Sequence, residues 1–135
     1  MVARILIVDD ERHICSLIAR LLTLRGKPLN LEVVTAGSYA EAVTLLEASR
    51  FDLVLTDYRM PGHSGIDLLT LVRSRWPSTL RVLMTGFQEG EDEARALTEA
   101  APAAIIRKPW DNDTLWLTLA LLLQRTDRGR TGGAP

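Results

Sequence analysis

Five polar side chains stand where apolar runs of this chain end. Asp9 and Asp10 follow the first run, Asp57 ends the third, Thr85 ends the fourth, and Lys108 follows the last. If these runs are neighbouring parallel strands, their carboxyl ends gather three carboxylates, a hydroxyl and an ammonium at one sheet edge. That edge is where open α/β sheets bind their ligands.

Three carboxylates gathered in one place are costly unless a cation lies among them. Two carboxylates about 5 Å apart repel by roughly 3 kcal/mol at an effective dielectric near 20, whereas a helix cap contributes only about 1 kcal/mol. Carboxylate oxygens with no His or Cys beside them suit Mg²⁺, and Lys108 supplies a further positive charge. The sequence therefore predicts a magnesium site at this edge.

Each of these motifs alone has an ordinary structural explanation. An acidic pair after a strand often caps a helix, a threonine often ends a strand, and a Lys-Pro pair usually belongs to a loop. Their joint placement at the ends of four apolar runs favours a functional site over these separate explanations.

Strand-like and helical patterns alternate along the chain and would position these side chains. Short apolar runs rich in β-branched residues alternate with segments whose apolar residues recur at helical spacing. The alternation predicts an α/β fold, a five-stranded parallel sheet with helices on both faces. The predicted strands span residues 5–8, 31–35, 52–56, 80–84 and 103–106, and the predicted helices 11–25, 38–48, 64–75, 90–100 and 111–125.

Residues 1–125 are predicted to form a single domain. From residue 126 onward the chain turns to Gly, Arg, Pro and Thr, which predicts a disordered tail or a linker stub over 126–135. Within the domain, Ser38 followed three residues later by Glu41 predicts a capping box at the start of the second helix.

The composition excludes few further classes of function. The 135 residues carry a net charge of −1, which gives no indication of nucleic-acid or membrane binding. The single cysteine, Cys15, excludes an internal disulfide, and its helical apolar context predicts a small buried side chain. With no signal-peptide pattern and no long apolar stretch, we expect a cytoplasmic protein.

Residues 3–125 resemble the receiver domain of bacterial two-component response regulators, which has a (βα)5 flavodoxin-like fold. The resemblance lies in four motifs in matching order and spacing: Asp9-Asp10, Asp57 with Met60-Pro61-Gly62, Thr85-Gly86 and Lys108-Pro109. It implies a phospho-acceptor signalling domain, not an enzyme with a separate substrate. Such a domain takes a phosphoryl group from the phosphohistidine of a sensor histidine kinase or phosphotransfer protein, and catalyses its own Mg²⁺-dependent phosphorylation and dephosphorylation.

The resemblance also implies particular roles near the third strand. Asp57 is the phosphoryl acceptor, Asp10 binds Mg²⁺ directly, and Asp9 acts partly through water. Asp57 and the backbone carbonyl of Arg59 complete the protein ligands, and the Arg59 side chain stands where relatives tune the phosphoryl lifetime. His63, in the following loop, is expected to be a solvated side chain because this chemistry needs no histidine there.

Further roles are implied after the fourth and fifth strands. Thr85 and Lys108 are expected to contact phosphoryl oxygens, and the peptide before Pro109 is expected to be cis. Phe87 stands at a second position that tunes the phosphoryl lifetime in relatives. Many relatives carry an aromatic residue where this chain has Ile105, so we expect its switch to work without an aromatic flip.

The last predicted helix carries apolar residues on two faces. At about 100° per residue, one face carries four leucines and is assigned to the core: Leu115, Leu119, Leu122 and Leu123. Leu117 and Leu121 lie on roughly the opposite face, one turn apart, with Trp116 at the margin. Because exposed apolar patches mark interfaces, we expect a homodimer or a partner surface there.

Two other classes of protein share parts of this pattern. A Mg²⁺-dependent phosphatase with an aspartate nucleophile usually carries Asp-x-Asp after its first strand, a spacing that Asp9-Asp10 lacks. A flavin-binding flavodoxin needs a phosphate-binding loop after the first strand, where this chain has two acids that repel phosphate. A flavoprotein would also purify with a yellow colour.

Overall fold

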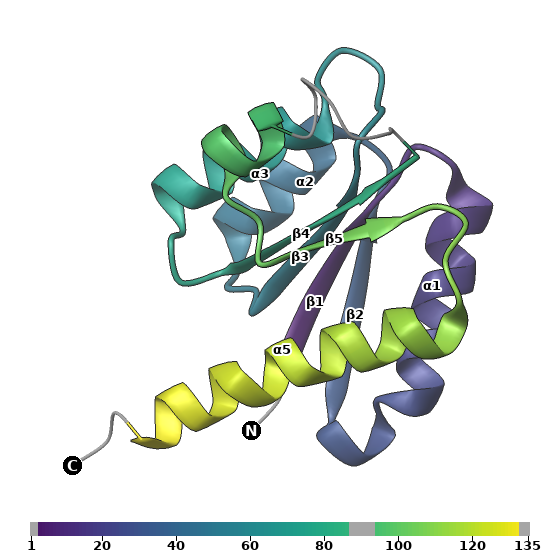
Figure 1. Cartoon of the computed structure of the whole chain (residues 1–135), viewed down its shortest axis with the longest axis vertical. Coiled ribbons are helices and arrows are strands. Elements are labelled where there is room, and N and C mark those ends of the chain that lie inside the picture. Colours follow the sequence, from purple (N-terminus) through teal and green to yellow (C-terminus); the bar gives the residue numbers. More distant parts are fainter. Residues whose placement is uncertain (1–2, 87–93, 133–135) are drawn as a thin grey trace.

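A five-stranded parallel sheet forms the centre of the domain (Figure 1). The structure is a computed structural model that describes residues 3–86 and 94–132. The sheet has the strand order β2-β1-β3-β4-β5, and every pair of neighbours is parallel. Its strands are β1 (Ala3–Val8), β2 (Leu31–Ala36), β3 (Leu53–Asp57), β4 (Leu80–Thr85) and β5 (Ala104–Arg107).

Helices cover both faces of this sheet and bury two separate apolar clusters. The chain forms α1 (Arg12–Arg25), α2 (Tyr39–Ala48), α3 (Gly65–Arg75) and α5 (Asn112–Gly132), with the short segments η1 (Lys27–Leu29) and η2 (Ala96–Ala100). One cluster joins α1 and α5 to the sheet, and the other joins α2, α3 and η2 to the opposite face. The predicted α/β architecture is therefore confirmed.

The alternation of side chains along β1 shows how the sheet serves both clusters. Ile5 and Ile7 belong to the cluster under α1 and α5, whereas Leu6 and Val8 belong to the cluster under α2 and α3. All four are completely buried, because helices cover both faces of the sheet at this inner strand. Continuous apolar runs of this kind are typical of strands buried on both faces.

The capping box predicted at α2 is only half present. The backbone N–H of Glu41 donates to Ser38 Oγ at 3.1 Å, but the Glu41 carboxylate accepts from Gly37 N instead of Ser38 N. A reciprocal box forms at α3, where Ser64 Oγ accepts from Asp67 N at 3.1 Å and Asp67 Oδ2 accepts from Ser64 N at 3.0 Å. The α3 box fixes the loop that follows β3.

The last helix is longer than the sequence pattern predicted. α5 continues to Gly132, so the prediction that this helix ends near Arg125 is wrong. Once a helix is nucleated by buried residues, each further residue adds a hydrogen bond at little cost. That residues 126–135 form a disordered tail or a linker stub outside the domain stays a prediction.

Candidate functional site

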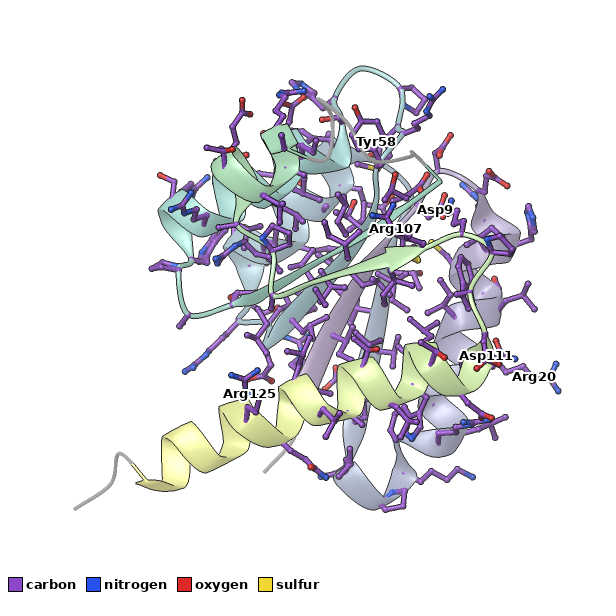
Figure 2. All side chains as sticks on the ribbon, viewed as in Figure 1. Asp9, Arg20, Tyr58, Arg107, Asp111 and Arg125 are labelled. Carbon is purple, nitrogen blue, oxygen red and sulfur yellow. The ribbon has the colours of Figure 1, made fainter. Side chains whose placement is uncertain are left out.

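The carboxyl ends of four strands bring the predicted site residues to one edge of the sheet. Asp9 directly follows β1, Asp57 and Thr85 are the last residues of β3 and β4, and Lys108 directly follows β5. Parallel register aligns these ends, since Asp57 pairs with Met84 and Thr85 with Arg107. Figure 2 shows Asp9 and Arg107 at this edge, where the strands end.

Three acids converge there as the sequence predicted. Carboxylate oxygens of Asp9, Asp10 and Asp57 all lie within 4.8 Å of one another. Asp9 and Asp57 are buried, with exposed fractions of 0% and 6%, whereas Asp10 is exposed to solvent. The site therefore opens to solvent on the side of Asp10.

Burial makes the charge of Asp9 costly. Burial, reinforced by the charges of Asp57 and Asp10, raises the pKa of Asp9 from 3.8 to about 6, although the Glu11 amide and Lys108 oppose the rise. Asp9 Oδ1 accepts a hydrogen bond from Glu11 N at 3.0 Å, and Oδ2 is buried without a hydrogen-bond partner among the described residues. A buried, unpaired carboxylate oxygen among three acids fits a hard divalent cation such as Mg²⁺.

Lys108, the cation that the sequence predicted at this edge, contacts one of the three acids. Its Nζ lies 2.7 Å from Asp57 Oδ1. Burial acts to lower the pKa of Lys108, but the hydrogen bond to Asp57 and the charges of Asp57, Asp9 and Glu11 outweigh it and raise the pKa. Lys108 is therefore positively charged at neutral pH. The peptide bond before Pro109 is cis, as predicted.

The loop after β3 borders the open side of the site. Asp10, Tyr58 and Arg59 line a shallow depression of about 500 Å³ together with Met60, Pro61 and Ser64. Tyr58 N donates to Met84 O at 2.8 Å, which holds the start of this loop against β4. Arg59 is exposed and lines the same depression as Asp10.

Gly65 was not identified from the sequence, yet it allows α3 to approach the site. A Cβ at this position would lie 2.1 Å from the backbone oxygen of Asp57. Gly65 N also donates to Tyr58 O at 2.7 Å, which closes the loop between β3 and α3. The available signal was a glycine directly after the Ser64 cap, but only the fold shows what lies opposite it.

The remaining predicted site residues have different surroundings. Thr85 is 1% exposed, and its carbonyl accepts from Lys108 N at 2.9 Å, which ties β4 to the residue after β5. Ile105 is partly buried against the cluster under α2 and α3. Phe87 lies outside the described residues.

His63 is less isolated than the sequence suggested. Its ring stacks on Tyr39 with the ring centroids 4.1 Å apart, and its Nδ1 lies 4.0 Å from Asp67 Oδ2. The side chain is nevertheless 56% exposed. The stack links the loop after β3 to the first residue of α2.

Cys15 is buried, as predicted, and lies under the site. Its thiol donates to the Asp9 carbonyl at 3.3 Å, and burial raises the pKa of this thiol to about 11. The thiol is therefore protonated at neutral pH and acts as a small packing group.

The two faces predicted for the last helix are confirmed in α5. Leu117 and Leu121 are 57% and 59% exposed, and Trp116 packs partly against the core. The inward face is buried at Leu115, Leu119, Leu122 and Leu123. In α1, Leu17 is also an exposed leucine, with an exposed fraction of 61%.

Comparison with known proteins agrees with this geometry. Residues 5–120 match the family of response regulator receiver domains. The chain is 36% identical over 120 residues to the hydrogenase transcriptional regulatory protein HoxA of Bradyrhizobium diazoefficiens, covering 89% of this chain and 24% of that protein. It thus spans about a quarter of the length of this curated relative.

Solved structures show the same fold. The signal receiver domain of an HD domain-containing protein from Pseudomonas fluorescens has a TM-score of 0.86 at 30% identity, with 94% of this chain and 98% of that chain covered. The response regulator TrrA of Thermotoga maritima, solved in complex with Mg²⁺ and BeF, has a TM-score of 0.77 at 28% identity, with 89% and 98% covered.

The chain belongs to the response regulator receiver domain family and has its five-stranded, flavodoxin-like fold. It is therefore a domain of two-component signal transduction. The three acids and Lys108 at the sheet edge agree with this family. No helix within residues 3–86 and 94–132 is long and apolar enough to cross a membrane.

Proposed function

We propose that Asp57 is the residue that accepts the phosphoryl group. The observation that carries this proposal is its position: a buried carboxylate 2.7 Å from Lys108 Nζ and within 4.8 Å of the two other acids. A carboxylate oxygen of Asp57 attacks the phosphorus of a phosphohistidine, forming a P–O bond as the P–N bond breaks. The donor is a sensor histidine kinase or a phosphotransfer protein, and the transfer takes place in the cytoplasm.

Mg²⁺ is the proposed cofactor, held by carboxylates of Asp10 and Asp57, with Asp9 partly through water, and by the backbone carbonyl of Arg59. When bound, Mg²⁺ neutralises charge on the transferring phosphoryl oxygens. The buried, unpaired Oδ2 of Asp9 and its raised pKa support this assignment, since both are relieved by a cation. The protein's own contribution is to hold these oxygens together in a partly buried site before the donor arrives.

Lys108 and Thr85 complete the proposed site. Lys108 holds Asp57 in the unphosphorylated chain and, after transfer, its ammonium pairs with a phosphoryl oxygen instead. The hydroxyl of Thr85 is proposed to donate to a second phosphoryl oxygen. The same groups position water for hydrolysis, so the domain promotes both the gain and the loss of its phosphoryl group without a separate substrate.

Phosphorylation is proposed to change an interaction surface of the domain. The phosphoryl group brings nearly two negative charges and strong acceptor oxygens to the Asp57 position. Thr85 and Lys108 are joined through their backbones at the ends of β4 and β5, and Ile105 lies on β5, which leads into α5. A shift of this edge can therefore reach the outer face of α5 without an aromatic side chain at position 105, while Arg59 and Phe87 adjust the phosphoryl lifetime.

Intact mass spectrometry after incubation with acetyl phosphate and Mg²⁺ tests this proposal. Wild type is expected to gain one phosphoryl group, and the gain should disappear when Mg²⁺ is chelated. Asp57→Asn should gain none, whereas Asp111→Asn, which changes an exposed acid at the start of α5, should label like wild type. Equal labelling of Asp57→Asn and wild type would contradict the assignment.

A further inference from the structure

The loop between β3 and α3 is anchored at both ends by backbone hydrogen bonds. Tyr58 N, at its start, donates to Met84 O at 2.8 Å, and Gly65 N, at its end, donates to Tyr58 O at 2.7 Å. Figure 2 shows Tyr58 at the same edge of the sheet as Asp9. These bonds hold the ends of the loop, and residues 59–63 between them depend on side-chain contacts for their position.

Two side chains join the middle of this loop to the rest of the domain. Met60 packs against the apolar cluster under α2 and α3. The ring of His63 stacks on the ring of Tyr39, with the centroids 4.1 Å apart and the ring planes at 22° to each other. His63 is 56% exposed, and its Nδ1 lies 4.0 Å from Asp67 Oδ2, which is too long for a hydrogen bond. The stack is therefore the contact most able to fix this side chain.

Tyr39 is a firm support for this stack. It is the first residue of α2 and packs against the same apolar cluster as Met60. The helix begins at a capped turn, where Ser38 Oγ accepts from Glu41 N at 3.1 Å. The core and the helix thus hold Tyr39 in place, and the exposed ring of His63 is fixed against it.

The same loop carries the backbone carbonyl that is proposed to bind Mg²⁺. Arg59 lines the depression beside Asp10, and His63 follows four residues later in the chain. An aromatic stack shifts the balance between held and free positions of a loop by roughly two- to tenfold. A metal binds the fraction of chains in which its ligands are in place, so loss of the stack weakens the apparent affinity by that fraction.

We propose that His63 and Tyr39 are positioning residues of the magnesium site. Their ring stack holds the loop after β3 so that the Arg59 carbonyl stays beside the acids, and it thereby raises the affinity of the domain for Mg²⁺. The step that concerns Mg²⁺ rests on the proposed function, whereas the order of the loop is a property of the metal-free chain. A histidine that the phosphoryl chemistry itself does not need acquires a role through this contact.

The backbone order of the loop in EDTA tests the stack without any metal. We expect ¹⁵N relaxation to give order parameters of about 0.85 for the amides of residues 59, 62 and 63 in wild type, and below about 0.6 in His63→Ala and Tyr39→Leu. His63→Phe and Tyr39→Phe keep two stacked rings and should restore the wild-type values, which a general loss of stability would not explain. Unchanged order parameters in His63→Ala overturn the proposal.

Titration calorimetry with Mg²⁺ then measures the consequence for the metal. His63→Ala and Tyr39→Leu should raise the Mg²⁺ dissociation constant at least about threefold, and the two phenylalanine variants should bind like wild type. Val43→Ala is the matched control, because Val43 also packs from α2 against the cluster that holds Tyr39. It should leave the dissociation constant unchanged even if it lowers the free energy of unfolding.

The two measurements separate the ways in which this proposal and the proposed function can fail. A wild type that binds no Mg²⁺ contradicts the proposed metal site, and the order parameters then decide alone whether the stack holds the loop. Equal Mg²⁺ affinity in wild type and His63→Ala overturns the positioning role. If His63→Phe behaves like His63→Ala in both assays, the contact with Asp67 and not the ring stack holds the loop, and the proposal is wrong.

Discussion

Asp9 gives the most quantitative prediction, because burial makes its charge costly in the metal-free protein. Its pKa of about 6 in the fold exceeds the ordinary value of 3.8 by about 2 units. At 1.36 kcal/mol per unit, ionised Asp9 lowers the free energy of unfolding by about 3 kcal/mol. Asp9→Asn keeps the oxygen that accepts from Glu11 N and removes the charge. We expect the variant to be more stable than wild type at pH 7.5 by about 2 to 3 kcal/mol in EDTA.

The sign of this effect depends on pH. An acid whose pKa is raised on folding binds its proton more tightly in the native state, so its destabilising effect appears as the pH rises from about 4 through 6. The advantage of Asp9→Asn should therefore be close to zero near pH 4 and reach its full value above pH 7. Urea unfolding followed by circular dichroism, with EDTA present, measures both values.

Magnesium and a control variant make this experiment decisive. Saturating Mg²⁺ should stabilise wild type more than Asp9→Asn, because the cation relieves the charge that the variant lacks. Glu32→Gln removes an exposed acid of β2 that pairs with Arg4, and it should change stability by no more than about 0.5 kcal/mol. An Asp9→Asn variant that is less stable than wild type in EDTA at pH 7.5, or equally shifted at both pH values, refutes the reasoning.

Three further predictions concern the groups around Asp57. Gly65→Ala should lower the free energy of unfolding by more than about 2 kcal/mol in urea titrations, because its Cβ would lie 2.1 Å from the Asp57 carbonyl oxygen. A variant as stable as wild type would show that α3 can move away from β3 at no cost. Ser64→Ala should cost about 1 kcal/mol in the same assay through loss of the α3 cap, and a change below about 0.3 kcal/mol would contradict that cap. Lys108→Met should slow labelling by acetyl phosphate at least about tenfold, measured by intact mass over time, while an unchanged rate would exclude Lys108 from the transfer.

The site could be predicted from the sequence because it depends on a general property of parallel sheets. The carboxyl ends of parallel strands meet at one edge, so Asp9, Asp57 and Lys108 could be placed together before their distances were known. The apolar runs identified all five strands to within two residues at each end, since strands buried on both faces must be continuously apolar.

Features that depend on contacts between distant segments could not be predicted from local pattern. Gly65 is required by the backbone of Asp57, which only the packing of α3 against β3 brings close. The ring stack of His63 joins the loop after β3 to the first residue of α2. The carboxylate of Glu41 accepts from the N–H of Gly37, although the N–H of Ser38 is its neighbour in the chain. The length of α5 was missed because residues 126–132 carry no apolar periodicity, although the helix continues through them.

Direct location of the phosphoryl group tests the central claim most directly. After labelling with acetyl phosphate and Mg²⁺, borohydride reduces an aspartyl phosphate to homoserine, and trypsin releases residues 51–59, which contain both Asp52 and Asp57. Fragment masses of this peptide distinguish the two acids. We predict homoserine at position 57 alone. Homoserine at position 52, or in the peptides that carry Asp9 and Asp10, would contradict the assignment of Asp57 as the acceptor.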